Sequence, residues 1–230
     1  MKNVIAFILA AIMSVAIVFV ASMLFFPSED NNASKEDTEP AISLTVSQSD
    51  HREALYNFTF TLNDEEYSLP CKYRVFENNG WALRKPTEMI DASSNMTGIY
   101  MKKSGRSLEV EIINYSKSPI MCCNGQINTV SASVSDFGKI ELRGAVTFDG
   151  TSSPDFIRQE LGEPNEYDAD DEKITLTYKK ADYRKVQFVF YKKRTYENTG
   201  YLKNDGNIYM PPLESGYFDQ VVIIQCRNDG

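Results

Sequence analysis

Histidine is nearly absent from this 230-residue sequence, which holds one histidine, one tryptophan and four cysteines. His51 is therefore the single imidazole that could serve as a general base. Zinc sites need ligands in spaced pairs such as C-x-x-C, and the sequence contains none. We accordingly predict no metal or cofactor site. A Cys–His nucleophilic pair would require His51 to meet a cysteine far away in the sequence.

Basic residues are also scarce, since 24 Lys and Arg stand against 32 Asp and Glu, a formal net charge of −8. Such a chain repels a phosphate backbone, so we expect no nucleic-acid partner. For the same reason, the folded domain is not expected to dock on an anionic membrane surface. The lysine-rich pieces 178–180 and 192–194 lie beside alternating runs and predict solvated charges at a sheet edge or hairpin.

One long hydrophobic run, Val4–Phe26, follows Lys2 and is interrupted only by two serines. About 23 helical residues can cross a hydrocarbon core of ~30 Å, so residues 1–26 predict a single transmembrane anchor, with residues 4–26 as the only membrane contact. The basic Lys2 stays in the cytoplasm, which places the C-terminal domain outside the cell. The alternative is a cleaved secretory signal ending near Ser22, which would release a secreted protein. No cysteine follows the run closely, which excludes a bacterial lipoprotein anchor.

Beyond the anchor, residues 27–49 are polar and acidic and show no apolar periodicity. Such a stretch cannot bury enough surface to offset its ordering, so we predict an acidic disordered tether. The rest of the chain divides into a first α+β unit, residues 50–136, and a second α+β unit, residues 137–230.

The four cysteines, Cys71, Cys122, Cys123 and Cys226, would lie in a compartment that permits disulfides. A bond between the neighbours Cys122 and Cys123 requires a strained ring. A long-range bond from one of them to Cys71 or Cys226 is one alternative. Reduced or partly buried thiols are the other, and the sequence leaves both open.

Two short helices are predicted from their end signals. Residues 71–79 carry aromatic residues three apart and end at Gly80. The second helix has Ser153 as N-cap and Pro154 in its first position, and it ends at Gly162. Valine at Gly162 should therefore destabilise the domain more than valine at Gly206, which lies in a polar loop.

The segment after each helix repeats at a constant offset of 78 positions. Tyr100 corresponds to Tyr178, and an alternating run at 108–112 corresponds to one at 186–190. Further strands are predicted at 127–133, 139–148 and 220–226. The fold class is therefore α+β: two β-α-β-β(-β) units, each a short helix packed on an antiparallel sheet, after one N-terminal transmembrane helix.

The second helix also carries a recognisable pattern, Ser153-x-Asp155-x-Ile157-x-x-x-Leu161-Gly162-x-Pro164, followed by a strand pair. This pattern resembles the repeat of the β-lactamase-inhibitor-like fold and is similar to the small lipoprotein of the bacterial outer-membrane assembly machine. A glycine usually stands where this chain has Thr151. The first half resembles domains of uncharacterised exported proteins of Gram-positive bacteria. The resemblance implies protein-binding or scaffold roles.

Other candidate sites have competing interpretations. The acidic run 168–172 lacks the spacing of a calcium loop, and a solvated hairpin approach is the expected structure. Trp81 follows a helix end and is expected to pack against the sheet, with an interaction hot spot as the alternative. Paired carboxylates for glycoside hydrolysis cannot be singled out among 32 acidic residues.

The functional hypothesis that follows is an exported, membrane-anchored, non-enzymatic binding module acting on a protein or cell-envelope partner. No catalytic, cofactor-binding or metal-binding residue is predicted, and the binding residues are not identified by the sequence. The alternative is a cell-envelope hydrolase with unidentified acidic catalytic residues. A deep cleft with convergent titratable groups would favour the hydrolase, and a filled core with shallow faces would favour the binding module.

Overall fold

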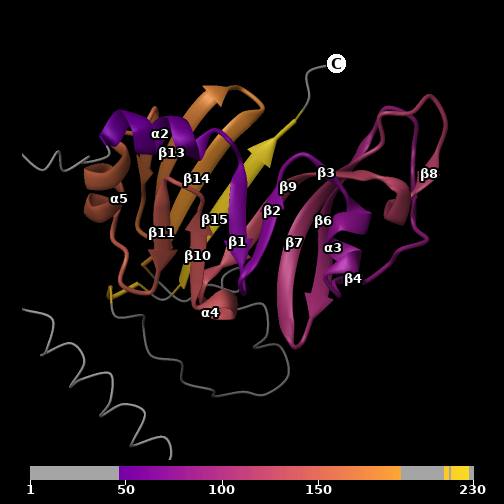
Figure 1. Ribbon diagram of the computed structural model, residues 1–230, viewed down its shortest axis with the longest axis horizontal. Helices are drawn as coiled ribbons and strands as arrows, with labels where there is room; N and C mark the ends of the chain where they lie inside the picture. Colours follow the sequence, from indigo (N-terminus) through magenta and orange to yellow (C-terminus); the bar gives the residue numbers. More distant parts are fainter. Residues whose placement is uncertain (1–46, 193–214, 218, 228–230) are drawn as a thin grey trace, which may run out of the picture. The chain divides into compact units, whose positions relative to one another are not determined.

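The structure is a computed structural model that describes residues 47–192, 215–217 and 219–227 (Figure 1). The described residues belong to one unit by their contacts. The predicted anchor, residues 1–26, lies outside the described residues, as do Gly206 and nearly all of the predicted tether. Among the helices that are described, none is long and apolar enough to cross a membrane.

The described chain is mostly antiparallel β-sheet with a few short helices, which confirms the α+β class in its coarse form. The helices are α2 (Gln48–Leu55), α3 (Tyr73–Asn78), α4 (Val134–Phe137) and α5 (Pro154–Leu161), with one 3-10 turn, η1 (Cys122–Asn124). The strands, in chain order, are β1 (Thr59–Leu62), β2 (Glu65–Ser68), β3 (Cys71–Lys72), β4 (Ala82–Leu83), β5 (Met89–Ile90), β6 (Asn95–Lys103), β7 (Arg106–Ile113), β8 (Ile120–Met121), β9 (Gln126–Ser133), β10 (Lys139–Leu142), β11 (Val146–Asp149), β12 (Glu166–Ala169), β13 (Lys173–Ala181), β14 (Arg184–Tyr191) and β15 (Asp219–Cys226).

A long sheet has the strand order β12-β13-β14-β15-β9-β7-β6-β4, and all of its pairs are antiparallel (Figure 1). A four-stranded sheet has the order β11-β10-β1-β2, and a small ribbon pairs β5 with β8. Strands β9 and β15 lie at the middle of the long sheet, with segments of the first half of the chain on one side and of the second half on the other.

Apolar and polar residues alternate along the central strands, which gives the long sheet one apolar face. In β7 and β14 the inward side chains are fully or almost fully buried, while alternate residues of β7 are polar. The inward triplets are Leu108, Val110 and Ile112 on β7, and Val186, Phe188 and Phe190 on β14. The sheet therefore faces the core on one side and presents a polar surface on the other.

A second layer covers the apolar face. Phe148 of β11 packs against Phe188 and Phe190 of β14, with ring centroids 5.2 and 5.5 Å apart. In the first half, Tyr67 of β2 stacks on Phe76 of α3 at 4.3 Å. These contacts belong to one continuous hydrophobic core. The core is filled by large side chains that leave little or no exposed surface.

Both predicted helices are present. In α5 the Ser153 hydroxyl accepts a hydrogen bond from the backbone N–H of Phe156, Pro154 is the first helical residue, and Gly162 has φ +75°, so these signals are confirmed. The first helix begins at Tyr73, because residues 71 and 72 pair with β9 as strand β3. Gly80 follows its end with φ +83°, as predicted.

The offset of 78 positions is reproduced in the strand boundaries. Strand β13 begins and ends 78 positions after β6, and β14 does the same relative to β7. Each hairpin contains one irregularity, at a different place. As a result the predicted match of Tyr100 with Tyr178 does not extend to their environments, since Tyr178 is buried and Tyr100 is 41% exposed.

Two other sequence predictions are corrected. The predicted strand 139–148 is a hairpin of β10 and β11, because Gly144 adopts φ +71° in the turn between them. Helix α2 was not predicted and begins at the end of the predicted tether. The hydroxyl of Ser47 and the carboxylate of Asp50 form a capping box there.

Candidate functional site

The polar face of the long sheet contains a shallow hollow of about 340 Å³, which we call the sheet hollow. It crosses five neighbouring strands, in the order β14, β15, β9, β7 and β6. The residues that line it are Thr97, Gly98, Glu109, Val110, Glu111, Thr129, Ser131, Lys185, Gln187, Ile223 and Gln225. The site is therefore a product of strand order and brings together residues from both halves of the chain.

Two cross-strand rows form the floor of the sheet hollow. In the charged row, Glu111 pairs with Thr129, which pairs with Gln225, which pairs with Lys185. The second row runs from Glu109 through Ser131 and Ile223 to Gln187 in the same order of strands. Each row spans three strand spacings of about 4.8 Å, so its ends are roughly 14 Å apart. Glu111 and Lys185 are thus too far apart to pair within one chain.

The two carboxylates of the sheet hollow have different surroundings. Glu111 accepts hydrogen bonds from the Thr129 hydroxyl at 2.6 Å and from the Asn95 amide at 2.5 Å. No hydrogen bond or ion pair reaches Glu109 from the described residues, and burial raises the pKa of its carboxyl above the ordinary value.

At the other end, Lys185 is half-buried and likewise makes no ion pair or hydrogen bond through its side chain within the described part of the chain. The side chains of Ser131 and Gln225, between the charged ends, also form no hydrogen bond there. Half-buried polar groups without protein partners are satisfied by water or by a ligand. The sheet hollow is therefore a surface with unused donors and acceptors of both charge signs.

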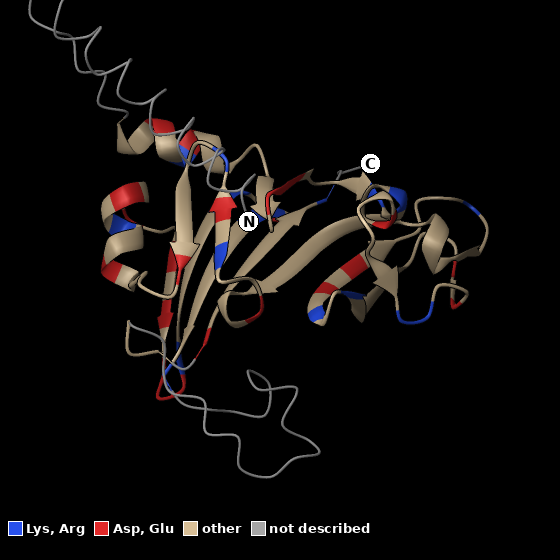
Figure 2. Cartoon of the chain, turned by 60° about the horizontal axis from the view of Figure 1, so that its bottom comes forward, with Lys and Arg blue, Asp and Glu red and all other residues tan. Residues whose placement is uncertain are grey.

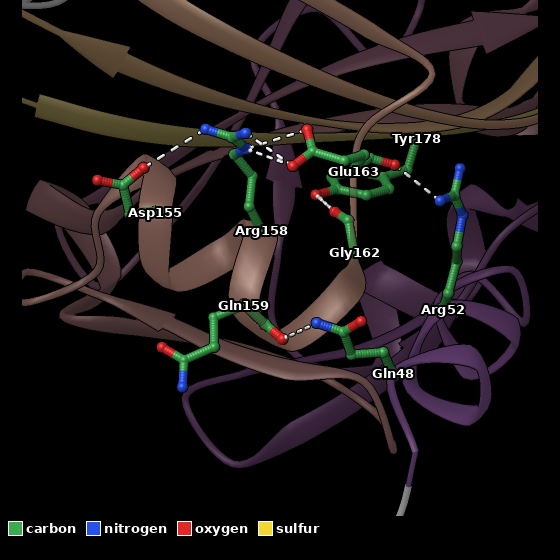
Figure 3. A network of polar contacts seen from close by, with 8 residues as sticks. All are labelled: Gln48, Arg52, Asp155, Arg158, Gln159, Gly162, Glu163 and Tyr178. Atoms are coloured by element: carbon green, nitrogen blue, oxygen red, sulfur yellow. Dashed lines mark hydrogen bonds and ion pairs between the residues drawn. The ribbon is translucent and has the colours of Figure 1, made fainter.

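A second polar cluster joins α2 to the end of α5 (Figure 3). The Gln48 amide donates to the Gln159 carbonyl at 2.5 Å, and Arg52 donates to the Glu163 carbonyl at 2.7 Å. The Arg52 guanidinium also lies over the ring of Tyr178, 5.3 Å from its centroid. The Gln159 carbonyl is one that the helix end leaves without a partner, and the Glu163 carbonyl lies just beyond the helix. These contacts explain how a helix with a single buried residue, Leu55, is held in place.

Around this cluster, charges of both signs alternate on α2 and α5 (Figure 2). Arg158 pairs with Asp155 at 3.6 Å and with Glu163 at 2.7 Å. Exposed pairs of this kind add little stability. The hydroxyl of Tyr178 donates to the Gly162 carbonyl at 2.8 Å and fixes the chain just beyond the helix. We interpret the cluster as structural, because its polar groups are engaged with one another.

The residues singled out from the sequence do not form a nucleophilic pair. His51 lies on α2 with its Nδ1 3.3 Å from Glu160 of α5. Cys71, Cys122 and Cys123 carry free thiols, which corresponds to the reduced alternative of the two that the sequence left open. Burial raises the pKa of Cys71 to about 12 and also raises the pKa of Cys122. Both are therefore protonated at neutral pH and poor nucleophiles.

Trp81 is 2% exposed and donates from Nε1 to the Tyr67 hydroxyl at 2.9 Å, which confirms packing and rules out a surface hot spot. The acidic run 168–172 forms the approach to the β12–β13 hairpin, as expected, where Asp170 accepts from two backbone N–H groups. Within the described residues, no group of three or more His, Cys, Asp or Glu is arranged to hold a metal ion.

The sequence signal for the sheet hollow was incomplete. Alternation along 108–112 indicates that Glu109 and Glu111 share a face of β7. Nothing in the sequence indicates that β9 pairs with β15, which brings Lys185 onto the same surface.

Comparison of the chain with protein-family models, with curated proteins and with solved structures found no match.

Proposed function

We propose that this chain is an exported, membrane-anchored, non-enzymatic binding module, and that the sheet hollow is where it binds a protein or cell-envelope partner. The proposal depends on one observation above all: Glu109 and Lys185 are half-buried on an open sheet face and have no partner among the described residues. The filled core and the shallow site also favour a binder, because enzymes usually place reacting groups in deeper clefts.

The proposal includes the finer architecture and the location. The domain consists of two β-α-β-β(-β) units, residues 50–136 and 137–230, each with a short helix packed on the sheet, and its fold is of the β-lactamase-inhibitor-like kind. Residues 1–26 anchor it in the cell membrane and residues 27–49 are its tether. The matching boundaries of β6–β7 and β13–β14 support the two units. The hydrophobic run after Lys2 supports the anchor.

Site-specific photo-crosslinking tests the binding surface. A photoreactive amino acid is placed at Gln225, in the middle of the sheet hollow, and in a control protein at Lys139, an exposed residue of β10 in the other sheet. Intact cells expressing the full chain are illuminated, and adducts are identified by mass spectrometry. We expect a specific adduct from position 225 and none from position 139. Equal labelling from both positions, or none from position 225, would exclude the sheet hollow as the binding surface.

The location is tested with protease on intact cells, after removal of any wall. The domain should be degraded, while the mature protein retains residues 1–26 in its mass. A mature N-terminus at Met23 would show cleavage after Ser22 and secretion instead. Protection of the domain until lysis would refute the outward orientation.

The hydrolase alternative now has named candidates. Glu109 and Glu111 lie two residues apart on β7, which separates their Cα atoms by about 6.6 Å. This is near the distance between the two carboxyl groups of inverting glycosidases. Their unequal surroundings are typical of an acid and a base. Under this alternative the purified protein would release sugars from cell-wall glycan, and Glu109→Gln would abolish the release. An unchanged rate in that variant would remove the alternative.

A further inference from the structure

The charged row of the sheet hollow is complementary to itself. Its order is acid, hydroxyl, amide, base, from Glu111 to Lys185. The midpoint of the row falls between β9 and β15, the central pair of the long sheet (Figure 1). Consider a second copy of the chain related to the first by a rotation of 180° about an axis that is parallel to the strands and passes through this midpoint. The acidic end of the charged row in one copy then lies over the basic end of the same row in the other copy.

Strand lengths make such a rotation sterically reasonable. On either side of the midpoint come strands of eight, eight and nine residues: β9, β7 and β6 on one side, and β15, β14 and β13 on the other. The same rotation therefore lays each strand of one copy over a strand of equal length in the second copy. Surfaces that match themselves in this way are the basis of two-fold symmetric dimers.

We propose that the protein partner of the sheet hollow is a second copy of this chain, docked face to face about this two-fold axis, so that Glu111 of each copy pairs with Lys185 of the other. This inference rests on the proposed function, since it names the partner of the same surface. The half-buried Lys185, which has no partner within the described chain, gains one from the second copy.

The second row fits the same arrangement. Glu109 of one copy faces Gln187 of the other, whose amide can donate to a carboxyl group, and Ser131 faces the apolar Ile223. No charged residue lies in the middle of either row, so docking leaves no unpaired charge at the centre of the interface.

Side-chain length accommodates the twist between stacked sheets. Packed sheets cross at about 30°, and the charged groups lie roughly 7 Å from the axis. This crossing angle therefore displaces the two groups of a pair from each other by about 4 Å. Glu and Lys side chains can cover that displacement. The interface is polar and of limited depth, which predicts a weak dimer that dissociates as salt concentration rises.

Carbodiimide coupling of the purified full chain tests the arrangement, because this reagent joins a carboxylate directly to an amine in contact with it. Two differently tagged copies are mixed in mild detergent and coupled. We expect a covalent dimer in which a peptide carrying Lys185 is joined to one carrying Glu111. The same link cannot form within one chain, where the two residues are about 14 Å apart.

Charge reversal makes the test specific. Lys185→Glu and Glu111→Lys should each lower the association constant of the dimer, measured by analytical ultracentrifugation without coupling, by roughly tenfold, since each change replaces the two attractive contacts of the two-fold dimer by two repulsive ones. Mixing the two variants should restore the link, because the introduced lysine of one faces the introduced glutamate of the other. Lys139→Glu makes the same charge change at an exposed position of β10, in the other sheet, and should leave the association constant unchanged.

Lys185→Glu keeps the test valid if Glu111→Lys fails to fold, because the Lys185 side chain has no hydrogen bond or ion pair to lose within the described chain. Absence of the Lys185–Glu111 link in the native protein, or a dimer that persists in Lys185→Glu, would overturn the inference. If the probe at Gln225 captures a different protein while no self-link forms, the proposed function stands and the inference alone is wrong.

Discussion

Gly162 ends helix α5 in a backbone conformation that residues with a Cβ avoid. Its dihedral angles are φ +75° and ψ −171°, a region occupied almost exclusively by glycine. A Cβ built at this position would meet no atom closer than Gln48 Oε1, at 3.8 Å. Replacement by alanine therefore adds backbone strain without a steric clash. The strain costs about 1–3 kcal/mol, and lower entropy of the unfolded chain offsets about 0.4–1 kcal/mol of it.

The expected net loss in Gly162→Ala is thus about 1–2 kcal/mol. For a domain of this size each kcal/mol lowers Tm by about 2–4 °C, so Tm should fall by roughly 2–8 °C. Valine should lower it further because its branched Cβ is less compatible with this conformation. Thermal unfolding followed by near-ultraviolet circular dichroism measures both variants.

Gln159→Ala is the matched control, because Gln159 is exposed on the same helix and its side chain makes no hydrogen bond within the described chain. Its Tm should change by less than about 1–2 °C, the usual range for such surface positions. Equal changes in Gly162→Ala and Gln159→Ala would refute the conformation assigned to Gly162. They would also remove the end signal on which the α5 prediction depends.

Three other substitutions test separate parts of the fold. Tyr67→Phe leaves the indole N–H of Trp81 without its buried acceptor and should lower the free energy of unfolding in urea by about 1–3 kcal/mol. Arg52→Ala removes the hydrogen bond to the Glu163 carbonyl and should speed amide exchange in α2 roughly tenfold, measured by mass spectrometry. Burial raises the pKa of Asp219 above 3.8, so its protonated form favours folding at low pH, and that stability is lost as pH rises through the raised pKa. Asp219→Asn escapes this loss, so its Tm relative to the native protein should rise between pH 4 and pH 7.

Control variants separate these effects from general destabilisation. Tyr183→Phe removes the hydroxyl of a tyrosine that is 49% exposed and should change the unfolding free energy by less than about 0.5 kcal/mol. Arg74→Ala, at an exposed position of α3, should leave exchange in α2 unchanged. A Tm difference between Asp219→Asn and the native protein that stays constant with pH would contradict the raised pKa. Unchanged exchange in Arg52→Ala would show that α2 is held mainly by Leu55.

Local signals were sufficient for the central hairpins and for α5. Alternation alone predicts β7 and β14, because a strand with one buried face needs an apolar residue at every second position. The Ser153, Pro154 and Gly162 signals each act on a helix end within a few residues. Such features can be derived from sequence because their causes lie inside the element itself.

Helix α2 and the β10–β11 hairpin could not be derived in this way. In α2 only Leu55 is buried, so the helix has almost no apolar period, and it is held by carbonyls of residues about 111 positions later in the chain. The β10–β11 turn interrupts residues 139–148, in which polar and apolar residues alternate as in a single strand. The sheet hollow could not be derived for the same reason. It exists only where β9 pairs with β15, and most of the second half of the chain lies between these two strands in the sequence.

Comparison of the two hairpins at the offset of 78 positions separates what folding requires from what it does not. The inward triplets of β7 and β14 are apolar in both hairpins, because both face the same core. The outward positions differ: Ser107 corresponds to Lys185, and Glu109 corresponds to Gln187. A polar face needs polar residues but no particular arrangement of charge, so the core does not explain why acids lie on β7 and a base on β14. Because of this asymmetry, one end of the sheet hollow is acidic and the other is basic. A partner with complementary charges would recognise this distribution of charge.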